Sequence, residues 1–86
     1  MKQKIAVIAA ILENPEDVQD DFNSIVARFR HLIRGRMGLP MSDSNISALA
    51  LICTGSVDEI NSLTGKLGNI EGINIKTSIS STEILN

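Results

Sequence analysis

The runs "KIAVIAAIL", residues 4–12, and "ISALALICT", residues 46–54, decide the fold. Both are apolar at nearly every position, which is typical of a β-strand that is covered on both faces in the middle of a sheet. A short buried helix is the alternative for the first run. Its valine and isoleucine content, and the turn signal "ENPED" that follows it, favour the strand. We therefore expect two central strands.

The segment between these runs changes its period. In "NPEDVQDDFNSIVARFRHLI", residues 14–33, apolar side chains recur at spacings of 4, 3, 4 and 3 (Val18, Phe22, Ile25, Phe29 and Leu32). That spacing predicts one face of a helix. Asn14 can cap its start, with Pro15 at the first helical position. Acidic residues crowd the first turns and basic residues the end, which complements the helix dipole.

A second helix is predicted over "SVDEINSLTGKLGNI", residues 56–70. Its apolar residues again have helical spacing (Val57, Ile60, Leu63, Leu67 and Ile70). Ser56 and Glu59 have the spacing of a capping box. We expect Gly68 to take the left-handed conformation that ends the helix, and Gly72 to turn the chain into the last strand. Gly65, inside the helical pattern, indicates close packing or a loosely wound turn.

Two further segments have the character of edge strands. "IRGRMGLP", residues 33–40, alternates and ends at a proline, so we expect Ile33, Met37 and Leu39 on one side and Arg34 and Arg36 on the other. "GINIKTSIS", residues 72–80, alternates strictly. It is predicted to turn four side chains inward (Ile73, Ile75, Thr77 and Ile79) and three outward (Asn74, Lys76 and Ser78). "STEILN", residues 81–86, is left as a tail.

The element order is therefore βαββαβ in a single domain, residues 1–86. A ferredoxin-like α+β fold, an antiparallel sheet of four strands in the order 4-1-3-2 with two helices on one face, puts the two apolar strands in the centre. The other face then carries apolar side chains, namely Ala6, Ile8, Ala10, Leu49 and Leu51 or their alternates. Because soluble monomers rarely expose such a patch, we expect a second copy of the chain to bury it.

Composition limits the function. The net charge is −2 and the only aromatic residues are Phe22 and Phe29, so we expect no direct binding of nucleic acid. Cys53 is the single cysteine, so no disulfide forms within the chain and a reducing cytoplasm is the expected location. No stretch has the length of a membrane span, and the apolar run near the N-terminus is followed at once by acidic residues rather than a cleavage site. A domain of this size gains stability from oligomerisation.

The "GK" of Gly65 and Lys66 does not form a phosphate-binding loop. Such a loop needs a second glycine five residues upstream and a Ser or Thr after the lysine, at the start of a helix. Here Leu67 follows the lysine, and the pair lies near the end of the predicted helix, which disfavours anions.

Other candidate chemistry is also sparse. His31 and Cys53 alone cannot supply a zinc site, although a site shared between subunits stays open. Cys53 lies in an apolar strand, where a nucleophile is not expected. The acidic residues at the start of the first helix are typical of helix stabilisation and a solvated surface. We therefore predict no catalytic residue, no metal site and no cofactor.

Three basic residues project from the predicted edge strands: Arg34, Arg36 and Lys76. Protection of the sheet edges against unwanted pairing is the ordinary explanation for such charges. The alternative is that they rim a pocket for an anionic ligand at a dimer interface.

Two stretches also resemble a known family. "LTGKLGNIEGINIKT", residues 63–77, and "RGRMGLP", residues 34–40, in a βαββαβ chain of this length resemble the iron-only hydrogenase system regulator family of small ACT-like proteins. The most specific matches are Gly65, Lys66, Leu67, Gly68, Gly72 and Lys76, with Arg36, Gly38 and Pro40. The resemblance implies a role in regulating or assembling iron-only hydrogenase.

The ACT-like resemblance further implies domains that pair and bind small effectors, often amino acids, at the interface. Asn14 and Pro15 match the loop that follows the first strand in ACT domains, whereas Glu16 stands where a glycine would admit a ligand. The family is also similar in fold to the metal-sensing domain of the nickel-responsive repressor, but that domain relies on several His and Cys side chains and this chain has one of each, so we do not expect nickel sensing. We therefore expect a non-enzymatic regulator acting as a homo-oligomer. The alternatives are a metal- or DNA-associated regulator with a site between subunits and, more remotely, a small enzyme with interface carboxylates.

Overall fold

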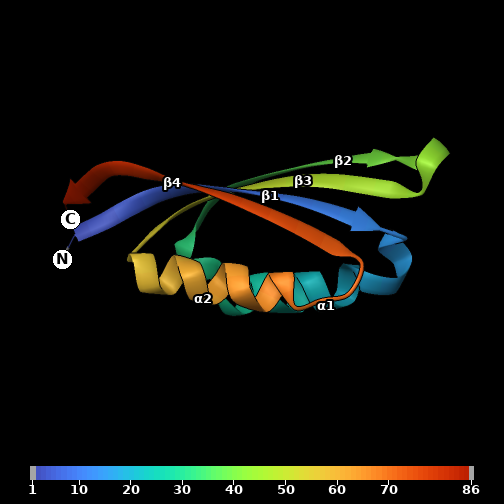
Figure 1. Ribbon diagram of the computed structural model, residues 1–86, viewed down its shortest axis with the longest axis horizontal. Helices are drawn as coiled ribbons and strands as arrows, with labels where there is room; N and C mark the ends of the chain where they lie inside the picture. The colour runs from blue at the N-terminus through green and yellow to red at the C-terminus, as the bar shows by residue number, and fades with distance from the viewer. Residues whose placement is uncertain (1, 86) are drawn as a thin grey trace.

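A single antiparallel sheet carries both helices on one side (Figure 1). The computed structural model describes residues 2–85. Its elements are β1 (Lys2–Glu13), α1 (Pro15–Arg28), β2 (Ile33–Met41), β3 (Ile46–Gly55), α2 (Val57–Gly68) and β4 (Ile73–Leu85). Short 3₁₀ turns, Arg30–Leu32 and Ser42–Ser44, lead into β2 and out of it. This order and arrangement confirm the predicted ferredoxin-like fold.

The strands lie in the order β2-β3-β1-β4, so the two apolar runs are central as predicted. β4 continues past the expected boundary, so the predicted tail is strand as far as Leu85, while Asn86 lies outside the described residues. The register of β4 against β1 shifts between Lys4 and Ala6. At that irregularity Lys4 Nζ donates a hydrogen bond of 2.8 Å to the Ser81 carbonyl.

The core lies between the sheet and the helices. Along β1, Ala6, Ile8, Ala10 and Leu12 face the helices and are buried, because side chains alternate between the two faces of a strand. The helices cover them with fully or almost fully buried side chains: Phe22 from α1, and Ile60, Leu63 and Leu67 from α2. Cys53, also fully buried, belongs to the same cluster. Of the two sets that the sequence offered for the other face, the set with Ala6, Ile8 and Ala10 therefore lies on the helix side. The residues that alternate with them form the other face of the sheet.

The start of α1 differs from the prediction in its chemistry. Asn14 is the N-cap residue and Pro15 follows it, but Asn14 has a left-handed backbone (φ 49°) and its side chain caps no helical N–H. Its Oδ1 instead accepts a hydrogen bond of 2.7 Å from Asn45 Nδ2. The Asn14 side chain is turned toward the β2–β3 connection, so the predicted side-chain cap is wrong.

The end of α2 also differs. The capping box of Ser56 and Glu59 is present, as predicted. Gly68 is the last helical residue and is not left-handed; the glycine with positive φ is Gly72, at 92°. A Cβ added to Gly65 would meet nothing within 4 Å, so close packing does not explain this glycine. Lys66 lies in the last turn, where the helix dipole favours a cation and disfavours phosphate.

Gly72→Ala and Gly65→Ala are expected to change stability in opposite directions. The positive φ of Gly72 is unfavourable for a side chain, and an added Cβ would lie 3.4 Å from Val18 Cγ1, so we expect a loss of about 1 kcal/mol or more. Gly65→Ala should add about 0.5–1 kcal/mol, because alanine is the better helix former and space is free. Urea unfolding of the two variants measures both changes. Equal effects of the same sign would contradict this interpretation.

A β-bulge in β2 overturns the predicted alternation. Ile33 pairs with Cys53 while Gly35 pairs with Ile52, so Arg34 is an extra residue between them. Beyond the bulge Arg36 pairs with Leu51 and lies on the helix side, whereas Met37 and Leu39 lie on the other face, opposite Ala50 and Ala48. Ile33 and Met37 therefore do not share a side, because the bulge reverses the alternation after Arg34.

Candidate functional site

Among the described residues, seven of the eight large apolar side chains that are exposed lie on the sheet face away from the helices, which we call the open face. Figure 1 shows both helices on the opposite side of the sheet. β1, β2 and β3 supply its apolar side chains: Ile5, Val7, Ala9, Ile11, Met37, Leu39, Met41, Ile46, Ala48, Ala50 and Ile52. Met37 and Leu39 are 71% and 60% exposed. On β4, Asn74, Lys76 and Ser78 form its polar border.

A groove of about 240 Å³ lies between α1 and β2, on the helix side of the sheet. Its floor is apolar, formed by Leu12, Phe22 and Leu49. Gly38 lies on β2 directly opposite Leu49, and Arg36 precedes it by two residues on the same face of the strand. The groove therefore combines an apolar floor with one cationic side chain at its wall.

Contacts with α1 hold Arg36 in place. Its Nη2 donates a hydrogen bond of 2.7 Å to Asn23 Oδ1. Its guanidinium carbon lies 5.7 Å from the centroid of the Phe22 ring, within the range of a cation–π interaction. The guanidinium is thus oriented on the wall of the groove by two neighbouring residues of the helix.

The three basic residues singled out from the sequence do not converge. Lys76 pairs with Ala9 and so lies on the open face, whereas Arg36 lies on the helix face. Arg34 is at the bulge, where its Nε donates a hydrogen bond of 2.9 Å to Thr54 Oγ1. Within one subunit, the three cations therefore do not form a common anion pocket.

Asn14 and Pro15 separate in a similar way. Pro15 lines the groove together with Arg36. Asn14 is joined to Asn45, since its backbone N–H donates to the Asn45 carbonyl at 3.0 Å in addition to the side-chain bond. Asn45 also has positive φ, 54°. Asparagine tolerates a left-handed backbone better than most residues do. An asparagine at each of these two turns is therefore the feature of the sequence that could have indicated this junction. The pair fixes the end of the β2–β3 hairpin against the start of α1.

An acidic hollow of about 730 Å³ lies at the same end of the sheet, lined in part by Glu13, Asp17, Asp21 and Glu71. Glu13 Oε2 accepts a hydrogen bond of 3.1 Å from Asn74. Within residues 2–85, no three His, Cys, Asp or Glu side chains are grouped closely enough to hold a metal ion. All four of these acidic residues are exposed to solvent.

The Cys53 thiol is an unsuitable nucleophile. Its side chain is fully buried, and burial raises the pKa of the thiol above its ordinary value. Because the thiolate is the reactive form, a thiol with a raised pKa is poorly reactive at neutral pH. Cys53 serves as a small residue of the core, in agreement with the prediction from its apolar strand.

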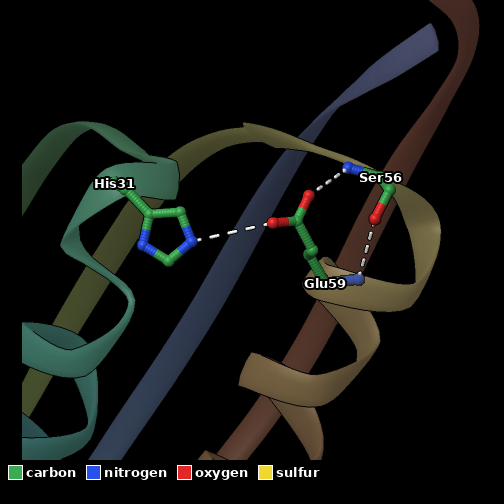
Figure 2. Close-up of polar contacts among 3 residues, drawn as sticks. All are labelled: His31, Ser56 and Glu59. Atoms are coloured by element: carbon green, nitrogen blue, oxygen red, sulfur yellow. Dashed lines mark hydrogen bonds and ion pairs between the residues drawn. The ribbon is translucent and has the colours of Figure 1, made fainter. Parts of the chain in front are cut away.

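A polar contact joins the 3₁₀ turn that follows α1 to the start of α2 (Figure 2). The Ser56 backbone N–H donates to Glu59 Oε1 at 3.0 Å, and Glu59 N donates to Ser56 Oγ at 3.1 Å. His31 Nε2 lies 3.6 Å from Glu59 Oε2. The hydrogen bond from the Ser56 backbone is the main reason why the pKa of the Glu59 carboxyl is lowered, and His31 acts in the same direction.

This lowered pKa makes the contribution of Glu59 pH-dependent. A carboxyl whose pKa is lower in the folded state stabilises the fold above its ordinary value of 4.5, and this contribution is lost as the pH falls through the folded pKa. We expect Glu59→Gln to cost a few tenths of a kcal/mol at pH 7, because the group is partly exposed. The difference from wild type should shrink as the pH drops below 4.5.

Urea unfolding at several pH values between 3 and 7 measures this effect. Glu71→Gln makes the same chemical change at an exposed turn residue and controls for net charge. A difference between wild type and Glu59→Gln that does not vary with pH would contradict the assignment.

Comparisons with known proteins place the fold and the family. The family model "TM1266-like: Iron-only hydrogenase system regulator, putative" matches residues 4–77. Among solved structures, protein TM1266 from Thermotoga maritima superimposes with a TM-score of 0.86 at 27% identity, covering 90% of this chain and 96% of that one. The search of the curated proteins found no match.

Two more distant structures share only the fold. The ACT domain of the GTP pyrophosphokinase from Chlorobium tepidum has a TM-score of 0.69 at 17% identity, covering 93% of this chain and 89% of that one. The apo form of CPII, a nitrogen regulatory PII-like protein from Thiomonas intermedia K12, has a TM-score of 0.55 at 8% identity, with 99% and 98% covered. With its ACT-like fold and a family match over residues 4–77, the chain belongs to the TM1266-like family of iron-only hydrogenase system regulators.

Proposed function

We propose that the chain is a non-enzymatic regulatory module of an iron-only hydrogenase system, and that it acts in the cytoplasm as a homo-oligomer that binds a small effector. Membership of the regulator family supports the regulatory role. The observation that carries the oligomer is the open face, where side chains such as Val7 and Ile52 are 44% and 46% exposed in a single subunit. A surface of this kind usually marks an interaction site.

The size of the open face fits a dimer. The molecule measures 42 Å in length and 16 Å along its shortest axis, the direction in which Figure 1 is viewed. The sheet is seen near its edge in that view, so the product of these extents, roughly 670 Å² (42 × 16), is an outer limit for the projected area of its face. Stable protein–protein interfaces bury about 800 Å² of accessible surface on each partner, so a dimer would use most of this face. In a dimer with a two-fold axis, the open face of one subunit would pack against the open face of the other. Such a dimer needs no second, complementary surface on the subunit.

The arrangement of polar residues supports a non-enzymatic role. Cys53 is buried with a raised pKa, and the acidic residues around Asp17 line an open hollow. The proposed regulation therefore works through association and binding rather than through a chemical step.

Within residues 2–85, no helix is long and apolar enough to cross a membrane.

Light scattering of the purified protein at micromolar concentration tests the oligomer directly. We expect a mass of at least twice the 9.3 kDa of one chain. A mass of 9.3 kDa at micromolar concentrations of the protein would overturn the proposed association. The regulatory role is tested separately by deleting the gene from its host and measuring iron-only hydrogenase activity, which we expect to change.

A further inference from the structure

We propose that the groove between α1 and β2 binds a small organic anion with a branched apolar body, held by Arg36. The proposal rests on the proposed function for the role of this ligand, since it names the chemical class of the effector. The ligand site proposed here differs from an interface site, because the groove lies within one subunit. Three observations support the proposal: residue 38 is a glycine and has no side chain, Arg36 is charged, and the groove is small.

Gly38 opens the groove. It lies on the helix face of β2, opposite Leu49 and between Arg36 and Pro40 on the same side of the strand. A Cβ built at this residue would lie 3.4 Å from Leu49 Cδ2, an ordinary contact, and would project over the apolar floor. Any longer side chain would occupy part of the groove. A glycine within a strand often marks a place that a ligand can approach closely, and the space beside Gly38 would allow this.

Among the residues that the structure describes, Arg36 has no acidic partner. An arginine side chain has five N–H donors, and the hydrogen bond to Asn23 uses one of them, on Nη2. Within residues 2–85, no Asp or Glu oxygen lies at ion-pair distance from this guanidinium. The planar guanidinium matches a carboxylate, with which it can form two parallel hydrogen bonds. Charge complementarity therefore favours an anionic head group.

The floor and the volume define the body of the ligand. Leu12 and Phe22 are almost fully buried, so most of the apolar surface that a ligand can reach in the groove comes from the half-buried Leu49 and from Pro15 and Pro40. The volume of about 240 Å³ lies just below the range of about 300–1,000 Å³ that is usual for ligand pockets, so the ligand must be small. A compact acid with a branched aliphatic chain fits both limits. Such a ligand would place its methyl groups on the floor and its carboxylate at Arg36.

Isovalerate is a suitable probe, and backbone ¹⁵N–¹H NMR spectra of the full chain report its position. We expect saturable shifts at residues of the groove, including Asn23, Gly38 and Ser47, with a dissociation constant of the order of 1 mM for so small a ligand. Isovaleramide, which lacks the charge, and inorganic phosphate, which lacks the apolar body, should each bind at least about tenfold more weakly.

Two variants and one control locate the binding. Arg36→Gln removes the charge and Gly38→Val fills the space, and each should weaken isovalerate binding at least about tenfold. Valine suits an exposed strand, so Gly38→Val should still fold. Arg30→Gln makes the same arginine change outside the groove and should bind like wild type. The spectra confirm folding of each variant through the residues that lie far from the groove.

Three results would overturn the proposal: no saturable shift with isovalerate, equally tight binding of isovaleramide, or unchanged binding by Arg36→Gln and Gly38→Val. Ligand binding and association of the subunits are tested separately, so light scattering is recorded on the same samples as the NMR spectra. Binding by a 9.3 kDa monomer would support the groove and reject the proposed association. An oligomer that binds no isovalerate would do the reverse.

Discussion

Val7→Asp is expected to convert the protein to a 9.3 kDa monomer at concentrations where the wild type is associated. Val7 lies on β1 in the open face, between Ile52 of β3 and Ser78 of β4. Its side chain is 44% exposed in one subunit, so a carboxylate here stays hydrated as long as the face is uncovered. If a second subunit covered the face, the carboxylate would lose its hydration and gain no charged partner, which costs several kcal/mol.

The size of the effect follows from symmetry. In a two-fold dimer the substitution introduces two carboxylates into one interface, and both are desolvated together. A penalty of only about 3 kcal/mol already raises the dissociation constant by about 100-fold. We therefore expect at least that change, measured by light scattering or sedimentation over a dilution series.

Val57→Asp is the matched control. Val57 is 42% exposed, close to the value for Val7, but it begins α2 on the other side of the sheet. An acidic residue is favourable in the first turn of a helix, so this variant should keep both its stability and its mass. Val7→Thr keeps the branched shape at the strand residue and should remain associated. If Val7→Asp kept the oligomer mass, the open face would not be the interface.

Much of the fold could be predicted because its determinants are local. The apolar runs at 4–12 and 46–54 have no polar face, so each requires a central position in the sheet. The capping box of Ser56 and Glu59 depends on residues three apart in the chain, and it is present as predicted. The predicted strand order followed from which strands had to be central, and the structure confirms it.

The errors arose where a distant segment decides the outcome. The bulge at Arg34 is a property of the pairing between β2 and β3, and nothing in "IRGRMGLP" alone marks it. It separates Ile33 from Met37, which the sequence had grouped on one side, whereas the predicted opposition of Arg36 and Met37 is present. Asn14 fails as a side-chain cap for a similar reason, because its partner Asn45 is 31 residues away.

The candidate site shows the same limit. Alternation in single strands placed Arg34, Arg36 and Lys76 at edges, but could not show that Arg36 and Lys76 lie on opposite faces. Gly38 matched the family pattern, yet its effect on shape became visible only when α1 was placed beside β2. Grooves between elements depend on tertiary packing, which a single strand does not encode.

Leu63→Ala is expected to lower the free energy of unfolding by about 2–5 kcal/mol, the usual range for a fully buried leucine. Leu63 is 0% exposed and belongs to the core cluster between α2 and the sheet. The loss combines the apolar area that leaves the core with the cavity that remains, since neighbours relax only partly. In a domain of 86 residues this is a large share of the total stability.

Urea unfolding measures this loss, and Ser62→Ala is its control. Ser62 is the preceding residue and is exposed, so the change should alter stability by a few tenths of a kcal/mol in the favourable direction, because alanine is the better helix former. A loss below about 1 kcal/mol for Leu63→Ala would contradict the tight packing of α2 on the sheet.

Association complicates this measurement, and the two predictions together resolve it. If folded subunits associate and unfolded chains do not, the apparent stability of the wild type rises with protein concentration. The Val7→Asp background should remove that dependence, because this variant is expected to fold as a monomer. Leu63 lies on the helix side and Val7 on the open face, so we expect their effects to be nearly additive in the monomer. A loss from Leu63→Ala that persists in the Val7→Asp background, independent of concentration, would assign the core to the single subunit. A loss found only in the associated protein would mean that the helix layer depends on the covered open face for its stability.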